Sequence, residues 1–95
     1  MKTLEITIKE SHLDAAMSED GWSTATCILQ KALEDKKECL YYASNGRSKF
    51  VLSDAARRVM TRFDRAHIEG NNYKEPFIDE LRKMLPITTV LKYVA

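Results

Sequence analysis

Apolar residues at helical spacing after Ser53 constrain the fold more than any other feature of this sequence. Ser53 is a favourable N-cap residue. The apolar face that follows it consists of Ala56, Val59, Met60, Phe63 and His67. Such a face is stable when it is buried against another element, because apolar side chains gain free energy on leaving water. The pattern therefore predicts a core helix with its polar side toward solvent.

Four segments have the character of strands. The segment 3–9 alternates apolar and polar residues, which is the period of a half-buried strand. Asn45-Gly46 predicts a hairpin turn between strands at 39–43 and 48–52, because both positions of a type I′ turn need positive φ. A last strand is predicted from Ile87 to Val94.

Three further helices are predicted. A short one is expected from Ser11 to Met17, with Asp14 three residues after a capping Ser11. Ser23 can cap a second helix, in which Trp22 and Cys27 have the spacing of a hydrophobic staple. Pro76 suits the first turn of the third, near the end of the chain.

The main elements follow the order strand, helix, strand, strand, helix, strand, with one small helix added in each half. This is the split β-α-β-β-α-β order of the ferredoxin-like fold. We therefore expect an α+β protein with a four-stranded, mainly antiparallel sheet. A length of 95 residues suits a single domain that spans 1–95.

Composition and cysteine usage narrow the classes of function. The net charge of +1 gives no long-range field toward nucleic acid or an anionic membrane. The N-terminus lacks a signal-peptide pattern, and no apolar run reaches the roughly 18 residues of a membrane span. Cys27 and Cys39 do not have the paired spacing of a zinc site. We expect a cytoplasmic protein without a metal or cofactor.

Arginines lie opposite the apolar face of the predicted core helix. This stripe consists of Arg57, Arg58, Arg62 and Arg65, and Lys49 precedes the helix. Arg58, Arg62 and Arg65 fall within about 60° of one another at helical spacing. The stripe suits an acidic protein surface or the phosphates of a nucleic acid. The alternative is a solvated face, partly neutralised by Asp54 at i−4 from Arg58.

Tyr41 and Tyr42 form a second candidate surface. They point to opposite faces of their predicted strand, so one of them lies away from the helix-covered face. Exposed amphipathic aromatics often anchor protein interfaces. We include Tyr41 among the candidate partner-binding residues, with burial under the small helices as the alternative.

The sequence gives little support to a catalytic function. A hydrolase dyad needs His12 or His67 within reach of a nucleophile, and His67 is expected on an apolar helix face. Cys27 is expected in the second turn of its helix, where the helix dipole lowers a thiol pKa little. An RNA-recognition domain would need stacking aromatics on its first strand, and 3–9 has none. We expect no enzymatic activity.

Three segments together resemble a loose group of short phage and prophage proteins. The segments are ITIKESHLD, CILQKAL and FVLSDAARRVMTRFD, which lie between Ile6 and Asp64. In that group the cysteine is usually followed by proline, whereas Cys27 is followed by Ile28. The resemblance implies a viral or prophage origin and no particular mechanism.

These observations together predict a non-catalytic protein that binds a macromolecule and inhibits or redirects it. The expected partner is a host or phage protein, for example a host-defence complex. The alternative is a nucleic-acid-binding accessory protein that uses the arginine stripe. No membrane partner is expected.

The predicted last strand also suggests a homodimer. In the ferredoxin-like order it lies at a sheet edge, where unpaired backbone groups invite a second chain. Val90 and Val94 make its outer face apolar as well, so either the edge or that face can bind a second copy. The alternative is that Tyr73 and the helix after Pro76 cover the outer face, which favours a monomer.

Overall fold

The computed structural model describes residues 2–18, 27–69 and 72–94 of the chain. The chain is α+β, as the sequence predicted. The described residues form four helices and five strands. In chain order they are β1 (Thr3–Ile8), α1 (Glu10–Ser18), α2 (Ile28–Glu34), β2 (Phe50–Val51), α3 (Asp54–Ala66), β3 (His67–Glu69), β4 (Asn72–Tyr73), α4 (Glu75–Met84) and β5 (Ile87–Tyr93).

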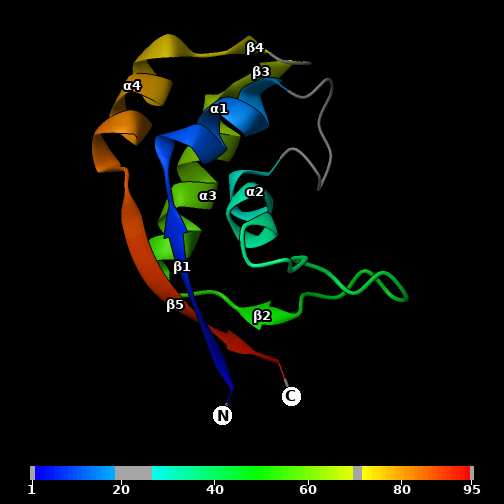
Figure 1. Ribbon diagram of the computed structural model, residues 1–95. Coiled ribbons are helices and arrows are strands. Elements are labelled where there is room, and N and C mark those ends of the chain that lie inside the picture. The colour runs from blue at the N-terminus through cyan, green and yellow to red at the C-terminus, as the bar shows by residue number, and fades with distance from the viewer. Residues whose placement is uncertain (1, 19–26, 70–71, 95) are drawn as a thin grey trace.

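The main sheet has three antiparallel strands in the order β1-β5-β2 (Figure 1). β1 pairs with β5 along its whole length, from Thr3 opposite Lys92 to Ile8 opposite Ile87. β2 pairs only with the end of β5. The strands β3 and β4 form a separate two-stranded sheet beside α3.

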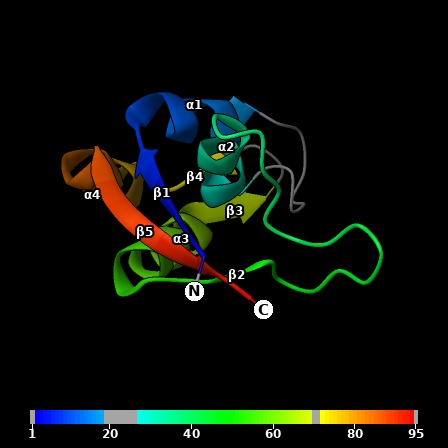
Figure 2. The same cartoon turned by 60° about the horizontal axis from the view of Figure 1, so that its bottom comes forward.

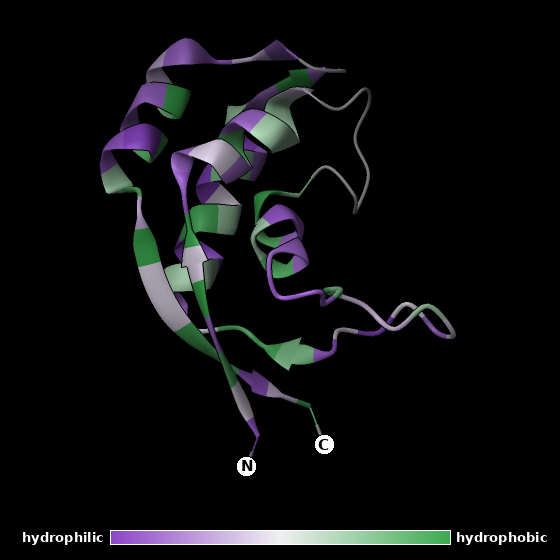
Figure 3. Cartoon of the chain, viewed as in Figure 1, coloured by the Kyte–Doolittle hydropathy of each residue, from purple (hydrophilic) through white to green (hydrophobic). Residues whose placement is uncertain are grey.

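The strands are amphipathic, and this decides which face of the sheet the helices cover. Ile6, Ile8 and Leu91 are buried, whereas Glu5 and Val90 on the opposite face are exposed. Figure 3 shows the corresponding alternation of hydropathy along β1. The helices α2 and α3 pack on the buried face, α1 packs on α2, and α4 packs on α3.

The predicted four-stranded ferredoxin-like sheet is wrong, because the segment 39–43 does not join it. This segment forms a hairpin of its own, with a single bridge between Tyr41 and Ser48, and it projects away from the sheet (Figure 2). Only Leu40 near its base is buried, and every residue from 41 to 47 is exposed. A strand with no apolar face to bury gains little from docking onto a sheet.

The predicted type I′ turn at Asn45-Gly46 is also wrong. Gly46 has a positive φ of 69°, but Asn45 does not. The Tyr42 N–H donates to the Arg47 carbonyl at 2.8 Å, which encloses a longer loop of residues 43–46. The Gly46 N–H donates to the Tyr42 carbonyl at 2.8 Å. Gly46 is the one residue of this loop in the left-handed conformation, which glycine adopts without strain.

The predicted edge position of the last strand is wrong as well. β5 lies between β1 and β2, so the expected homodimer through strand pairing of 87–94 loses its basis. The faces were predicted correctly, since Val90 and Val94 are exposed and Leu91 is buried. Neither Tyr73 nor α4 covers the outer face, because Tyr73 packs on the Phe63 ring and α4 packs on α3.

The core helix α3 agrees with the sequence prediction. The Ser53 hydroxyl accepts the Ala56 N–H at 3.2 Å and caps the helix. Phe63 is fully buried, with its ring centroid 5.4 Å from that of Tyr73. His67 ends the helix as its C-cap and begins β3, so it does not lie inside the helix as expected.

The start of α2 differs from its prediction. The structure has Cys27 as the N-cap, in extended conformation, and the helix begins at Ile28. The predicted cap at Ser23 and the staple through Trp22 lie outside the described residues. Cys27 therefore precedes the first turn of α2, whereas the sequence pattern placed it in the second.

The end of α2 contains a residue in an unfavourable backbone conformation. Lys37 has a φ of 56°. Its N–H donates to the Glu34 carbonyl at 3.0 Å, and the Glu38 N–H donates to the Leu33 carbonyl at 3.1 Å. This pair of bonds is the Schellman motif, whose left-handed position usually holds glycine.

Replacing Lys37 by glycine is expected to stabilise the protein. The left-handed conformation costs a lysine free energy that glycine avoids, so Lys37→Gly should raise the free energy of unfolding by about 0.5–1 kcal/mol. Glu34→Gly, at the last residue of α2, is the control and should lower it by about 0.5–1 kcal/mol. Urea unfolding followed by circular dichroism measures both; destabilisation by both changes would contradict the prediction.

Removing the Phe63 ring is expected to destabilise the protein strongly. Because this side chain is fully buried, Phe63→Ala should lower the free energy of unfolding by about 3–5 kcal/mol. The exposed neighbour Thr61 supplies the control, since Thr61→Ala should change it by only about 0.5 kcal/mol. Equal effects in a urea titration would show that α3 does not bury this face.

Candidate partner-binding site

The arginines of α3 lie on the solvent side of the helix. Arg57, Arg58, Arg62 and Arg65 are all exposed. Val59 and Phe63 on the opposite side are fully buried, so the predicted phase of the helix is confirmed. We call Arg58, Arg62 and Arg65, which share one side of α3, the arginine face.

Most of the positive charge on this face is not neutralised by other described residues. The Arg62 guanidinium lies 4.0 Å from the Glu80 carboxylate of α4, and both side chains are exposed. Arg58 and Arg65 form no ion pair with any residue in the described parts of the chain. An exposed pair at this distance contributes little stability, so the arginines have no evident structural task.

Arg57 differs from its neighbours. Its guanidinium donates to the Leu52 carbonyl at 3.3 Å, at the segment that leads into α3. The sequence grouped Arg57 with the stripe, but the structure gives it a contact of its own beside the N-terminus of the helix.

The structure places Lys49 in a separate polar cluster. Its amino group lies 3.0 Å from the Glu38 carboxylate, which also accepts the Tyr93 hydroxyl at 2.7 Å. These two hydrogen bonds, that from Tyr93 first, lower the pKa of Glu38, and the bond to Glu38 raises the pKa of Lys49. Lys49 also lies over the Tyr42 ring, 5.5 Å from its centroid.

Tyr41 lies in the projecting hairpin. Tyr41 and Tyr42 are 38% and 39% exposed, so no helix covers either ring. The hairpin projects away from α3 in both views of the chain (Figures 1 and 2). The structure does not bring the tyrosines together with the arginine face.

His12 is held by structural contacts through both ring nitrogens. Its Nδ1 accepts the Lys9 N–H at 2.9 Å, so the proton is on Nε2, which donates to Asp35 at 2.6 Å. Three residues into α1, this side chain takes the capping role that the sequence gave to Ser11 and Asp14. Asp14 instead binds Arg82 of α4 at 2.7 Å. No sequence pattern indicated the contact with Asp35.

The Cys27 thiol is not activated, although it precedes a helix. Burial raises its pKa, against the smaller effects of the backbone amides of Gln30 and Leu29. Cys39 is exposed.

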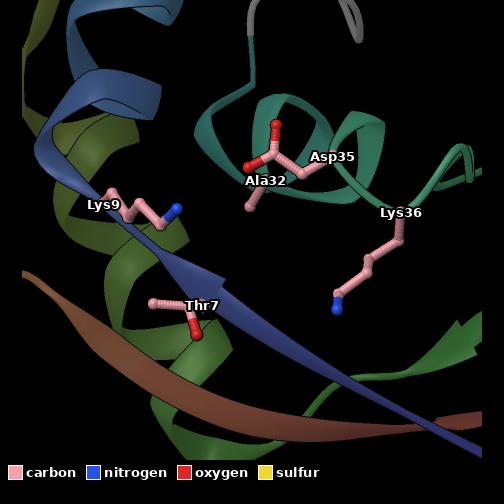
Figure 4. Close-up of a pocket in the computed structure, with 5 residues that line it drawn as sticks. All are labelled: Thr7, Lys9, Ala32, Asp35 and Lys36. Carbon is pink, nitrogen blue, oxygen red and sulfur yellow. The ribbon is translucent and has the colours of Figure 1, made fainter.

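Two open hollows lie on the described surface. One of about 290 Å³ lies between β5 and the start of α3, lined by Val51, Leu52, Ser53, Asp54, Val90 and Lys92. Another of about 160 Å³ lies between β1 and α2 (Figure 4). Among the described residues, no three His, Cys, Asp or Glu side chains gather where they can hold a metal ion.

No helix within 2–18, 27–69 or 72–94 has the length and apolar character needed to cross a membrane. Comparison with known protein families, curated proteins and solved structures found no match.

The Glu38 cluster predicts a pH-dependent contribution to stability. Because the folded pKa of Glu38 lies below its ordinary value of 4.5, its contribution is present at neutral pH. Glu38→Gln should therefore lower the melting temperature at pH 7, and the difference from the unaltered protein should shrink as pH falls through the folded pKa. Thermal unfolding from pH 7 to pH 3 measures this, with the exposed Glu5→Gln as control. A difference that stays constant with pH would contradict it.

Proposed function

We propose that the protein is a small non-catalytic binding protein whose arginine face contacts an acidic surface of another protein. The observation that carries the proposal is the exposure of Arg58, Arg62 and Arg65 on one side of a helix that is anchored by a fully buried opposite side. A rigid helix that presents guanidinium groups loses little entropy when those groups bind carboxylates.

The state of the candidate catalytic groups supports a non-catalytic role. Both nitrogens of His12 are bonded within the fold. The Cys27 thiol is buried with a raised pKa. Neither side chain is poised to act as a base or a nucleophile.

Two features favour a protein over a nucleic acid as the partner. The arginine face extends about 10 Å at 1.5 Å per residue, which is short for a track along several phosphates. Asp54 and Asp64 are exposed on the same helix, and Glu80 lies beside Arg62. Carboxylates at these places would repel phosphates, whereas a protein surface can match a mixture of charges.

The resemblance to phage proteins suggests the kind of partner. A small factor of this type would bind a host or phage protein and inhibit or redirect it, for example a host-defence complex. An exposed cationic helix that needs no cofactor is suited to blocking an acidic surface by occupancy alone.

The test reverses the charge of the arginine face. Arg58→Glu combined with Arg62→Glu should abolish capture of the partner from lysate, while the melting temperature changes little because both side chains are exposed. Arg47→Glu combined with Lys83→Glu makes the same change in net charge at exposed positions elsewhere and should bind as the unaltered protein does.

Nuclease treatment and salt separate the classes of partner. A protein complex should survive nuclease and weaken only moderately with salt. Loss on nuclease treatment, or a steep fall of affinity with salt, would assign the site to nucleic acid. Retained binding by the arginine double variant would show that the arginine face is not the interface.

A further inference from the structure

β1 is an edge strand with open backbone groups. The Tyr93 N–H donates to the Lys2 carbonyl at 3.0 Å, which fixes the alternation of hydrogen bonds along the β1–β5 pair. By this alternation Leu4, Ile6 and Ile8 direct their backbone groups toward β5. The N–H and C=O groups of Thr3, Glu5 and Thr7 therefore point away from the sheet, and no strand in the described parts of the chain pairs with them.

The open edge faces a groove whose other wall is α2. Thr7 and Lys9 line this groove on one side, and the C-terminal end of α2 lines it on the other through Ala32, Asp35 and Lys36. In Figure 4 the amino groups of Lys9 and Lys36 extend over the space between β1 and α2. An edge strand beside a helix is an arrangement in which a protein can bind an extended peptide as an additional strand.

The charges around the groove select the kind of peptide. Lys9 and Lys36 form no ion pair with any residue described by the structure, and Lys2 lies at the other end of β1. Among the nearby carboxylates, Glu38 is paired with Lys49 and Tyr93. Asp35 keeps its negative charge, because the His12 ring that donates to it has its proton on Nε2 and none on Nδ1, but its Oδ2 is turned toward that ring. Glu5 is exposed in the middle of the strand. The three lysines outnumber these two carboxylates, and the amino groups of Lys9 and Lys36 extend over the groove, so an acidic side chain there meets a small excess of positive charge.

We propose that the open edge of β1 and the adjoining groove of α2 bind an acidic, extended segment of another protein by strand addition. The backbone groups of Thr3, Glu5 and Thr7 pair with the segment. The amino groups of Lys9 and Lys36 contact its carboxylates on the side of α2. This site lies beside α2, whereas Arg62 of the arginine face is next to Glu80 of α4, so the two sites are separate.

A second copy of the chain fits the edge less well. The antiparallel register that uses all three open residues is centred on Glu5, and it places Glu5 opposite its own copy. Like charges directly opposite one another destabilise a strand pair. An acidic segment of another protein can place a neutral residue opposite Glu5 and carboxylates beside the lysines.

The experiment titrates the whole protein with a short blocked peptide in which glutamate alternates with threonine. Two control peptides separate backbone pairing from charge: one has N-methylated amides, and the other has lysine in place of glutamate. Binding should be seen for the first peptide only, with NMR shifts at the amides of Thr3, Glu5 and Thr7. Equal binding of the N-methylated peptide would overturn strand addition, and equal binding of the lysine peptide would overturn the charge selection.

Two variants of the protein, in place of altered peptides, test the same site. Glu5→Pro removes an outward N–H without removing a bond to β5, and Glu5→Ala makes the same loss of charge but keeps the N–H. Glu5→Pro should lower the affinity for the peptide by about tenfold relative to Glu5→Ala, because a backbone hydrogen bond is lost and the proline ring obstructs strand pairing. Equal affinities of these two variants would refute the site.

If Glu5→Pro does not fold, the site can still be tested with Lys9→Glu combined with Lys36→Glu. This double variant should also bind the peptide at least about tenfold more weakly. Lys74→Glu with Lys83→Glu is the matched control and should bind normally. Arg58→Glu with Arg62→Glu should also bind the peptide normally. The proposal for the β1 edge is therefore tested separately from the proposal for the arginine face. A chain that is dimeric without peptide, and monomeric as Glu5→Pro, would assign the edge to a second copy and overturn the proposal.

Discussion

The long antiparallel pairing of β1 with β5 holds the main sheet together and forms the face on which the helices pack. It joins the two ends of the chain in six consecutive antiparallel pairs. One face of this pair supplies Ile6, Ile8 and Leu91, on which α2 and α3 pack. Contacts between segments so distant in sequence cost much chain entropy, which the burial of this apolar face must offset. The same pairing leaves the other side of β1 without a partner strand among the described residues.

The protein is nearly neutral, but its charges are unevenly distributed. The net charge is +1. Some carboxylates are paired with cations within the fold, namely Asp14 with Arg82 and Glu38 with Lys49. Among the described residues, most cations of the arginine face and those beside β1 have no such partner. A neutral protein can therefore present local basic surfaces, which give specificity at short range without a long-range field.

Both proposed interfaces rest on a rigid support. The arginine face belongs to a helix whose other side is the centre of the core, and the open edge belongs to a strand held along its whole length by β5. The projecting hairpin with Tyr41 lacks such support, since its residues from 41 to 47 are exposed. Groups fixed before binding lose less entropy on binding, which favours the helix and the strand over the hairpin as primary contacts.

The elements with a strong local pattern could be predicted from the amino-acid sequence. The alternation in β1, the apolar residues of β5 and the period of α3 predicted these elements within about a residue, and with them the burial of Phe63 and the exposure of Arg58. These features follow from side-chain spacing within a single segment, so no distant residue is needed to infer them.

The way in which the elements pack together could not be predicted from these local patterns. The place of β5 between two strands, and the exclusion of the hairpin from the sheet, depend on which surfaces bury the most apolar area together. His12 and Asp35 are 23 positions apart, and Glu38 and Tyr93 are 55 apart. Hydrogen bonds between residues so far apart produce no repeating pattern in the sequence. Their partners come together only when the whole core packs.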